Sequence, residues 1–353
     1  MQARIDGVRI RGIAGEIPAH HYAVTDLVDS FGEKKIKRIQ RSTGVEEIHT
    51  VRPGMTAADL CEAAAKRLLA KLEVPRDSID GIIFSSFSPD YRSPATSILL
   101  QDRLGLSKET VAMDIAYGCS GYVYGLYQSS LMLKAGGCRR VLLCAGETQS
   151  LMINEQDRAM KVILGDGGSA TLLELDETSG EMMFCLRCDG SGYRDLLIEA
   201  GGFRLPRSEN TCIEEQDEDG NVRTKEDLRM DGMGVMQFSL REVPQAVSKV
   251  LNMAQLEKAE VDIFAMHQPN KLILEQLKMD MDVPSDKMPI GLQKTGNTSA
   301  ASIPVLLSVL KGRGYDFTTS KHAVICGFGI GLSLGAVLTD LSETDIMELE
   351  ELN

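Results

Sequence analysis

Cys119 has the residue type and the surroundings of a reactive thiol. It stands in the run Met113–Tyr122, where a strand-like stretch ends and an amphipathic helix begins directly afterwards. Unpaired backbone N–H groups and the macrodipole at a helix N-terminus favour an anion. An ordinary cysteine has a pKa of about 8.5, and a site of this kind can lower it to roughly 3.5–7.5. We therefore expect Cys119 to be a nucleophile with a lowered pKa, the alternative being an inert core cysteine.

His267 and Asn297 occupy the same kind of position as Cys119. His267 follows the strand-like run Asp262–Met266 and precedes a helix, and Asn297 lies in a polar loop that opens a helix. Open α/β sheets bind ligands at the carboxyl ends of their strands. Taken alone, the histidine would be a satisfied core residue and the asparagine a helix cap. Three such residues at equivalent positions instead predict one active site formed by Cys119, His267 and Asn297.

Two glycine-rich runs and a cysteine pair bear on other chemistries. The loop Cys326–Gly335 does not match the GxGxxG of dinucleotide sites, and its backbone N–H groups could instead face an oxyanion. The run Gly165–Gly168 lacks the Lys-Ser/Thr of a phosphate loop and predicts a structural turn. Cys185 and Cys188 form a CxxC without a second pair of ligands, so we expect no metal site.

Strand-like and helix-like segments alternate along the chain, which is typical of an α/β protein with layered sheets. The expected helices are 57–72, 95–104, 120–135, 235–251, 271–279 and 299–310, and the expected strands are 81–86, 110–116, 140–146, 165–173, 262–266 and 322–326. The second half repeats the layout of the first, so we predict two α/β halves: residues 1–175 with the cysteine and residues 176–353 with the histidine and asparagine. The polar run 203–229 predicts an exposed insertion, and the acidic tail 342–353 predicts a solvated end.

The composition limits the class of protein. The chain has 353 residues, 43% hydrophobic and 25% charged, which is ordinary for a globular protein with a large core. A formal net charge of -13 disfavours nucleic acid or an anionic membrane as the main partner. No apolar run approaches the ~18 residues of a membrane helix, and the N-terminus lacks the apolar core of a signal peptide. Eight irregularly spaced cysteines predict a reduced, cytoplasmic chain, and some of the 17 methionines could line a flexible ligand pocket.

Cysteine, histidine and asparagine in this order also occur in papain-like proteases, and the interval from Cys119 to His267 falls in their range. Those proteases carry the cysteine near the mature N-terminus, before an aromatic residue, and usually contain disulfides. Cys119 lies deep in the chain and is followed by Ser120, and the α/β alternation does not fit a protease of that kind. A non-catalytic partner subunit is a further alternative, but such a subunit would be expected to lack the nucleophile.

At these residues the chain resembles the thiolase superfamily, and within it the β-ketoacyl-ACP synthase III family. The similarity extends over nearly the whole chain and is carried by Ser42–His49, the Cys119 segment, Gly165–Ala170, Met230–Phe238, His267–Asn270 and Gly296–Pro304. Type III polyketide synthases share the triad and a Gly-Phe-Gly-Pro-Gly loop, which here has isoleucine in place of proline. The segments that follow His267 and Asn297 fit the ketoacyl synthases better.

The resemblance implies a five-layer α-β-α-β-α fold made of two related halves, and a homodimer. It also implies that Cys119 takes an acyl group from a thioester, and that malonyl thioester then loses carbon dioxide and attacks this acyl group. In this scheme His267 and Asn297 stabilise the enolate oxygen, and N–H groups of Cys119 and Gly329 form the oxyanion hole. Phe328 corresponds to a family phenylalanine of the acyl pocket, beside the thiol. CoA or phosphopantetheine thioesters are the substrates in this scheme, and no cofactor is implied.

The sequence departs from the family where the acyl donor binds. Family members carry Trp and Arg shortly before a Thr-Gly pair, and this chain has Arg38 and Ser42 at those positions. Arg38 and Arg41 could still bind the phosphates of CoA or of a carrier, or they belong to a solvated helix face. An aromatic residue that closes the acyl pocket from the neighbouring subunit is replaced by Ser93. This predicts room for medium or branched acyl groups, unless Tyr91 or a methionine fills the gap.

The implied function is the decarboxylative condensation of an acyl thioester with malonyl-ACP, giving a 3-oxoacyl product. Acyl transfer to a hydroxyl or an amine without decarboxylation and a type III polyketide synthase-like reaction remain alternatives. The implied partners are acyl-CoA or acyl-ACP, malonyl-ACP with its acyl carrier protein, and a second copy of the chain. The starter, the choice of CoA or ACP as donor, and fatty-acid initiation against a specialised polyketide or lipid pathway stay open.

Overall fold

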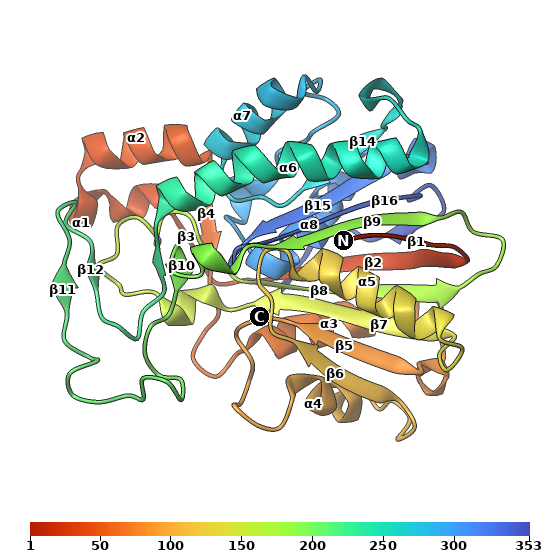
Figure 1. Ribbon diagram of the computed structural model, residues 1–353. Helices are drawn as coiled ribbons and strands as arrows, with labels where there is room; N and C mark the ends of the chain where they lie inside the picture. Colours follow the sequence, from red (N-terminus) through yellow and green to blue (C-terminus); the bar gives the residue numbers. More distant parts are fainter.

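Two β-sheets form the framework of the protein, and the computed structural model describes all residues, 1–353 (Figure 1). The first sheet has the order β17–β2–β8–β7–β5–β6, with β18 also paired to β2: β2 Val8–Pro18, β5 Gly81–Ser85, β6 Val111–Ile115, β7 Arg140–Glu147, β8 Gly167–Leu175, β17 Asp345–Ile346 and β18 Glu350–Leu352. The second sheet has the order β1–β9–β16–β15–β14: β1 Gln2–Ile5, β9 Met182–Cys188, β14 Ile263–Met266, β15 Ala323–Gly329 and β16 Ser333–Thr339. Strands β5, β6 and β7 are parallel, as are β14 and β15, so within each group the carboxyl ends meet at one edge.

Helices form three layers around these sheets, which confirms the predicted five-layer α-β-α-β-α fold (Figure 1). Helices α3 Ala57–Lys71 and α4 Thr96–Arg103 cover the outer face of the first sheet. The middle layer consists of α5 Gly121–Lys134 and α8 Ser302–Gly312, which share one apolar core with both sheets. Helices α6 Gly232–Ala254 and α7 Lys271–Met281 cover the outer face of the second sheet. None of these helices has the length and hydrophobicity to cross a membrane.

The remaining elements are short. Helices α1 Val28–Phe31 and α2 Glu33–Thr43 follow β3 His21–Ala23, which pairs with β4 Glu47–His49. In the predicted insertion, β11 Glu215–Gln216 pairs with β12 Val222–Arg223, and β10 Leu196–Leu197 pairs with β13 Arg229–Met230. Most residues of 203–229 are exposed, as predicted, and Leu228 is among the few that are buried.

Close packing between α3 and β8 explains the glycine-rich turn at Gly165–Gly168. Helix α3 begins after Thr56, whose backbone N–H donates to Asp59 Oδ2 at 2.7 Å, and its buried face consists largely of small residues. A Cβ added at Gly168 would stand 2.5 Å from the Cβ of Leu60, so only glycine fits. The turn therefore has the structural role that its sequence predicts.

The acidic side chains of the tail are exposed, as predicted, but the tail also forms strands, which its sequence did not indicate. Strands β17 and β18 both pair in parallel with β2, and Ile346 is buried in the core. The guanidinium of Arg67 offsets part of the acidic charge, with its Nη1 3.0 Å from Glu350 and its Nη2 3.1 Å from Glu16. Strand β1, at the start of the chain, joins the second sheet by pairing with β9. The division into residues 1–175 and 176–353 stays a prediction, and each end of the chain adds a strand to the sheet of the other half.

Candidate active site

Cys119, His267 and Asn297 line one cavity of about 70 Å³, although they lie far apart in the sequence. Cys119 stands between the end of β6 and the start of α5, and His267 follows directly after β14. Asn297 precedes the short 3₁₀ turn Ser299–Ala301, from which α8 continues. All three side chains are buried. The structure thus brings together the three residues that the sequence predicts to act together.

Burial controls the acidity of the Cys119 thiol. It raises the pKa of Cys119 above its ordinary value, while the Ser299 hydroxyl and the backbone N–H of Ile330 act in the opposite direction without offsetting it. The Cys119 Sγ lies 3.7 Å from Ser299 Oγ. The expected lowering of the pKa is therefore wrong, because the effect of removal from water exceeds that of the hydrogen bonds that favour the thiolate. The resting form is the thiol, and its proton must leave during reaction.

The loop after β15 supplies a backbone donor beside the thiol. The backbone N–H groups of Ile330 and of Cys119 itself interact with the thiol. The predicted role of Gly329 as a donor to a substrate oxyanion stays a prediction. Gly329 also lets the loop approach the nucleophile, because a Cβ there would stand 2.9 Å from Cys119 Sγ. Its φ of +150° is also a conformation that other residues rarely adopt.

A methyl group at Gly329 should therefore slow acylation of Cys119. Gly329→Ala is expected to lower the acylation rate by about 5- to 150-fold, which corresponds to the ~1–3 kcal/mol typical of local backbone strain. Stopped-flow measurement of acyl transfer from a thioester would give the rate. Gly314→Ala, at another positive φ but in open space, is the matched control. Equal rates in both variants would contradict the close approach.

His267 is held as a neutral imidazole. Burial lowers the pKa of His267 to about 3, so the ring carries no charge at physiological pH. Its Nδ1 lies 2.6 Å from Ser302 Oγ, and its ring meets the Phe328 ring edge-on with centroids 5.4 Å apart. Phe328 lines the same cavity, as the sequence predicts. A neutral imidazole can donate one hydrogen bond to an oxyanion, but it is a weak base.

Asn297 has its amide group oriented by its own loop. The Oδ1 accepts a hydrogen bond of 2.9 Å from the backbone N–H of Ser299, which leaves the amide NH₂ as the group available to the cavity. The backbone of Asn297 is anchored to the first half: its N–H donates to Ile163 O at 2.8 Å, and its C=O accepts from Gly165 N at 3.0 Å. Gln149 Nε2 also donates to this carbonyl, at 2.8 Å. The turn before β8 therefore holds a site residue, which its sequence did not indicate.

The rest of the cavity wall is apolar, and the sequence reasoning missed most of it. The wall includes no carboxylate, lysine or arginine, and its apolar members are Phe87, Met160, Ile163, Leu164, Leu196, Leu228, Met230, Val235, Pro269, Ile273 and Phe328. Two of the chain's methionines lie here, as expected for a flexible pocket. The sequence signal that could have indicated this wall is the apolar residues that flank the polar insertion. Strands β10 and β13 contain such residues and place them at the cavity.

Three predicted binding residues lie outside this cavity. Ser93 is exposed in the loop that follows β5. It does not line the Cys119 cavity of its own chain. Arg38 and Arg41 are exposed on α2, and Arg41 lines a separate cleft together with Lys271. Their roles toward a second subunit or a substrate stay predictions.

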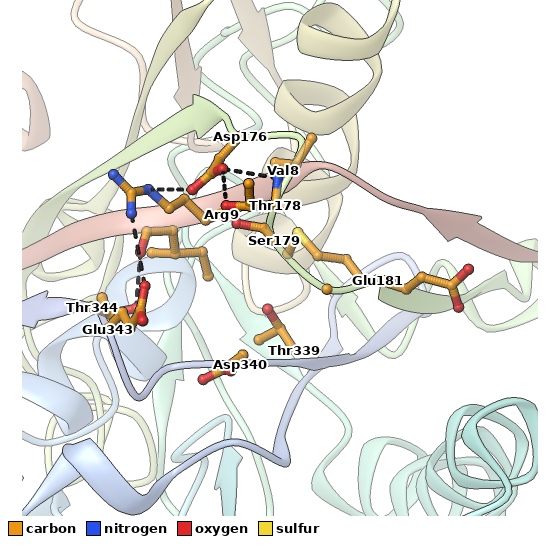
Figure 2. A pocket seen from close by; sticks show the side chains of 13 residues that line it. Val8, Arg9, Asp176, Thr178, Ser179, Glu181, Thr339, Asp340, Glu343 and Thr344 are labelled. Atoms are coloured by element: carbon orange, nitrogen blue, oxygen red, sulfur yellow. Dashed lines mark hydrogen bonds and ion pairs between the residues drawn. The ribbon is translucent and has the colours of Figure 1, made fainter.

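A second cavity, of about 190 Å³, lies at the ends of β9 and β16 that are far from Cys119. Figure 2 shows the side chains that line it. Thr339 and Met182 border it, whereas Ser333 and Cys188 lie at the ends of the same strands near the site. Arg9 Nε lies 3.4 Å from Asp176, and Arg9 also pairs with Glu174 and Glu343. The cavity is lined by ion pairs and hydroxyl groups but by no cysteine or histidine, so the catalytic candidate is the cavity at Cys119.

Comparison with known proteins places this geometry in a family. Residues 113–190 match 3-oxoacyl-[acyl-carrier-protein] synthase III, and residues 251–341 match the C-terminal part of that family. A β-ketoacyl-[acyl-carrier-protein] synthase III of Rhodopirellula baltica is 30% identical, with 95% of this chain and 98% of the relative covered. The crystal structure of a 3-oxoacyl-(acyl-carrier protein) synthase from Burkholderia xenovorans has a TM-score of 0.92 and 33% identity, covering 100% of this chain and 99% of the other.

The chain belongs to the 3-oxoacyl-ACP synthase III family. A third relative, from Alkalilimnicola ehrlichii, is 33% identical over 302 residues, which cover 85% of this chain and 89% of the relative. Membership confirms the resemblance to the thiolase superfamily, and it makes the protein a condensing enzyme of the acyltransferase type. The papain-like alternative does not fit this fold. One matched segment of the synthase III family contains Cys119, and the other contains His267, Asn297 and Phe328.

Proposed function

We propose that the protein condenses an acyl thioester with malonyl-ACP through an acyl-Cys119 intermediate, giving a 3-oxoacyl product. The observation that carries this proposal is a buried thiol in a cavity with two neutral donors, His267 and Asn297, and no ionised side chain in its wall. Decarboxylation requires donors aimed at a developing oxyanion and no general base. Acyl transfer to a hydroxyl or an amine would use a base, and a histidine with a pKa of about 3 is poorly suited to that role.

The first step transfers the acyl group. The Cys119 sulfur bonds to the carbonyl carbon of the starter thioester while the bond from that carbon to the carrier sulfur breaks. The thiol proton ends on the departing carrier thiol, so the exchange is balanced. During the step the carbonyl oxygen carries negative charge, and the backbone N–H groups of Cys119 and Ile330, which interact with the reacting sulfur, would donate hydrogen bonds to this oxygen.

The second step forms the carbon–carbon bond. Malonyl-ACP loses carbon dioxide, and the electron pair of the broken bond forms an enolate whose oxygen is stabilised by His267 and the Asn297 amide. The enolate carbon attacks the acyl-Cys119 carbonyl, and the carbon–sulfur bond to Cys119 breaks. The thiolate then takes up one proton and returns to the resting thiol. The acyl carrier protein keeps the 3-oxoacyl product, and this scheme uses no cofactor.

Intact-protein mass spectrometry tests the proposal. The protein is incubated with separate acyl-CoA and acyl-ACP thioesters, and malonyl-ACP is then added. We expect a mass increase equal to one acyl group, lost on addition of malonyl-ACP with release of carbon dioxide. Loss of the acyl group to an alcohol or amine without carbon dioxide would support simple acyl transfer instead. The same panel decides between CoA and ACP as donor.

Homodimer formation through β6 is part of this proposal. Strand β6 is the edge of the first sheet, and its outer side carries no partner strand within the chain. An unpaired strand edge is a template for pairing with another chain. Val111 on this strand is half-exposed, and the loop with Ser93 precedes α4, which packs against β6. A second copy at this edge would therefore lie close to Ser93. We also propose the cytoplasm as the compartment, because the irregular spacing of the cysteines indicates a chain without disulfides.

The protein is expected to accept medium or branched acyl starters at least as well as acetyl. With Ser93 in place of an aromatic residue, the pocket of the dimer should have room for extra methylenes, each contributing about 0.8 kcal/mol when buried. Competition among acetyl, butyryl, hexanoyl and octanoyl thioesters would measure the preference. Ser93→Phe should shift it toward acetyl, and Ser107→Phe, in a partly exposed loop after α4, is the control. A strict acetyl preference in the unmodified protein would show a closed pocket.

A further inference from the structure

Ser302 lies directly behind His267. Its Oγ is 2.6 Å from His267 Nδ1, and both residues are buried. Ser302 is the first residue of α8, and His267 follows β14, so the contact joins the middle helical layer to the second sheet. It leaves Nε2 as the ring nitrogen that can interact with a substrate in the cavity. The reaction scheme above assigns no role to this serine.

The numbers of donors and acceptors on the two side chains determine the direction of this hydrogen bond. A neutral imidazole has one N–H and one lone pair, and a hydroxyl has one hydrogen to donate. The Ser302 hydroxyl makes no hydrogen bond in the structure other than the one to Nδ1. If Nδ1 carried the proton, the buried hydroxyl hydrogen would have no acceptor, and buried polar groups are rarely left without a partner. The hydroxyl therefore donates to Nδ1, and the ring proton lies on Nε2.

We propose that Ser302 is a positioning residue that fixes His267 in the Nε2–H tautomer and so makes it a hydrogen-bond donor rather than a base. In the opposite tautomer, the Nε2 lone pair would be available to accept a proton from a hydroxyl or amine substrate. The serine thus favours stabilisation of an enolate over activation of such a nucleophile. This role in catalysis rests on the proposed condensation, whereas the tautomer itself does not.

Nuclear magnetic resonance of the unmodified protein tests the tautomer directly. The five histidines are labelled with ¹⁵N in the ring, and the His267 signals are assigned from their loss in His267→Asn. We expect Nε2 to give the signal of a protonated nitrogen and Nδ1 that of an unprotonated one, unchanged from pH 6 to 8. A protonated Nδ1 would overturn the proposal, whatever reaction the protein catalyses.

Variants test the consequence for catalysis. Ser302→Ala is expected to slow malonyl decarboxylation by about 10- to 100-fold, by analogy with residues that orient metal-binding histidines, and to mix the two tautomers. Ser302→Thr keeps the hydroxyl and should restore both the tautomer and the rate. The matched control is Ser308→Ala in the same helix, which loses a buried bond to Gly15 N far from His267.

Two outcomes separate the inference from the proposed function. Equal decarboxylation rates in Ser302→Ala and Ser308→Ala would overturn the positioning role. If the unmodified protein decarboxylates no malonyl thioester, the proposed function fails, while the ¹⁵N signals of unmodified protein and Ser302→Ala still decide whether the serine sets the tautomer.

Discussion

Replacing Cys119 by serine should abolish acyl-enzyme formation and, with it, condensation. Loss of the nucleophile of a covalent mechanism costs on the order of 10⁶-fold in rate in a well-studied protease, and a buried serine hydroxyl has no base here to activate it. Peptide mapping after treatment with an acyl thioester should place the whole adduct on Cys119. Since burial raises the pKa of this thiol, its labelling by iodoacetamide should keep rising with pH beyond the ordinary cysteine pKa of about 8.5.

The control for this experiment is an exposed thiol. Cys188 and Cys212 are both exposed, so Cys188→Ser should lose part of the nonspecific labelling and keep full acylation by the thioester. An adduct on Cys138 or Cys144 in the unmodified protein would disprove the assignment of the nucleophile.

Removing either donor should slow decarboxylation far more than acylation. His267→Ala and Asn297→Ala are each expected to lower the rate of carbon dioxide release by about 10²–10³-fold, the usual cost of losing one oxyanion donor. Acylation of Cys119 should change less, because its oxyanion is stabilised by backbone groups. Carbon dioxide release and acyl-enzyme formation would be timed separately.

The pH dependence adds a second check on His267. Its pKa is lowered to about 3, so the neutral donor is already fully present above that pH, and decarboxylation should show no titration of this histidine between pH 5 and 8. His322→Ala, outside the cavity, is the control and should leave carbon dioxide release unchanged. Normal decarboxylation in both donor variants would instead favour simple acyl transfer or hydrolysis.

Most of the helices, about half of the sheet strands and the three residues of the site could be predicted from the sequence, whereas β1, β2, β9 and β16 were not predicted. Strands and helices follow from the local spacing of apolar residues, and Cys119, His267 and Asn297 each stand where one element gives way to the next. Cys119 follows β6 of the first sheet and His267 follows β14 of the second, so their convergence depends on how the two sheets pack together. Backbone hydrogen bonds to Ile163 and Gly165 hold Asn297 beside them. The family motifs around these residues are short continuous segments, so they indicated the chemistry without knowledge of the fold.

The environment of those residues could not be predicted from the sequence, because it depends on contacts between distant segments. The sign of the Cys119 pKa shift depends on burial by the loop at Gly329, which is more than 200 residues away in the chain. The contact of the Ile330 N–H with the thiol also follows from the path of that loop. The tail became β17 and β18 because β2 has an edge to pair with, and the tail's local composition carries no sign of that edge. The contact of Ser302 with His267 likewise needs the register of two distant segments, because hydrogen bonds and burial depend on distances that neighbours in sequence do not set.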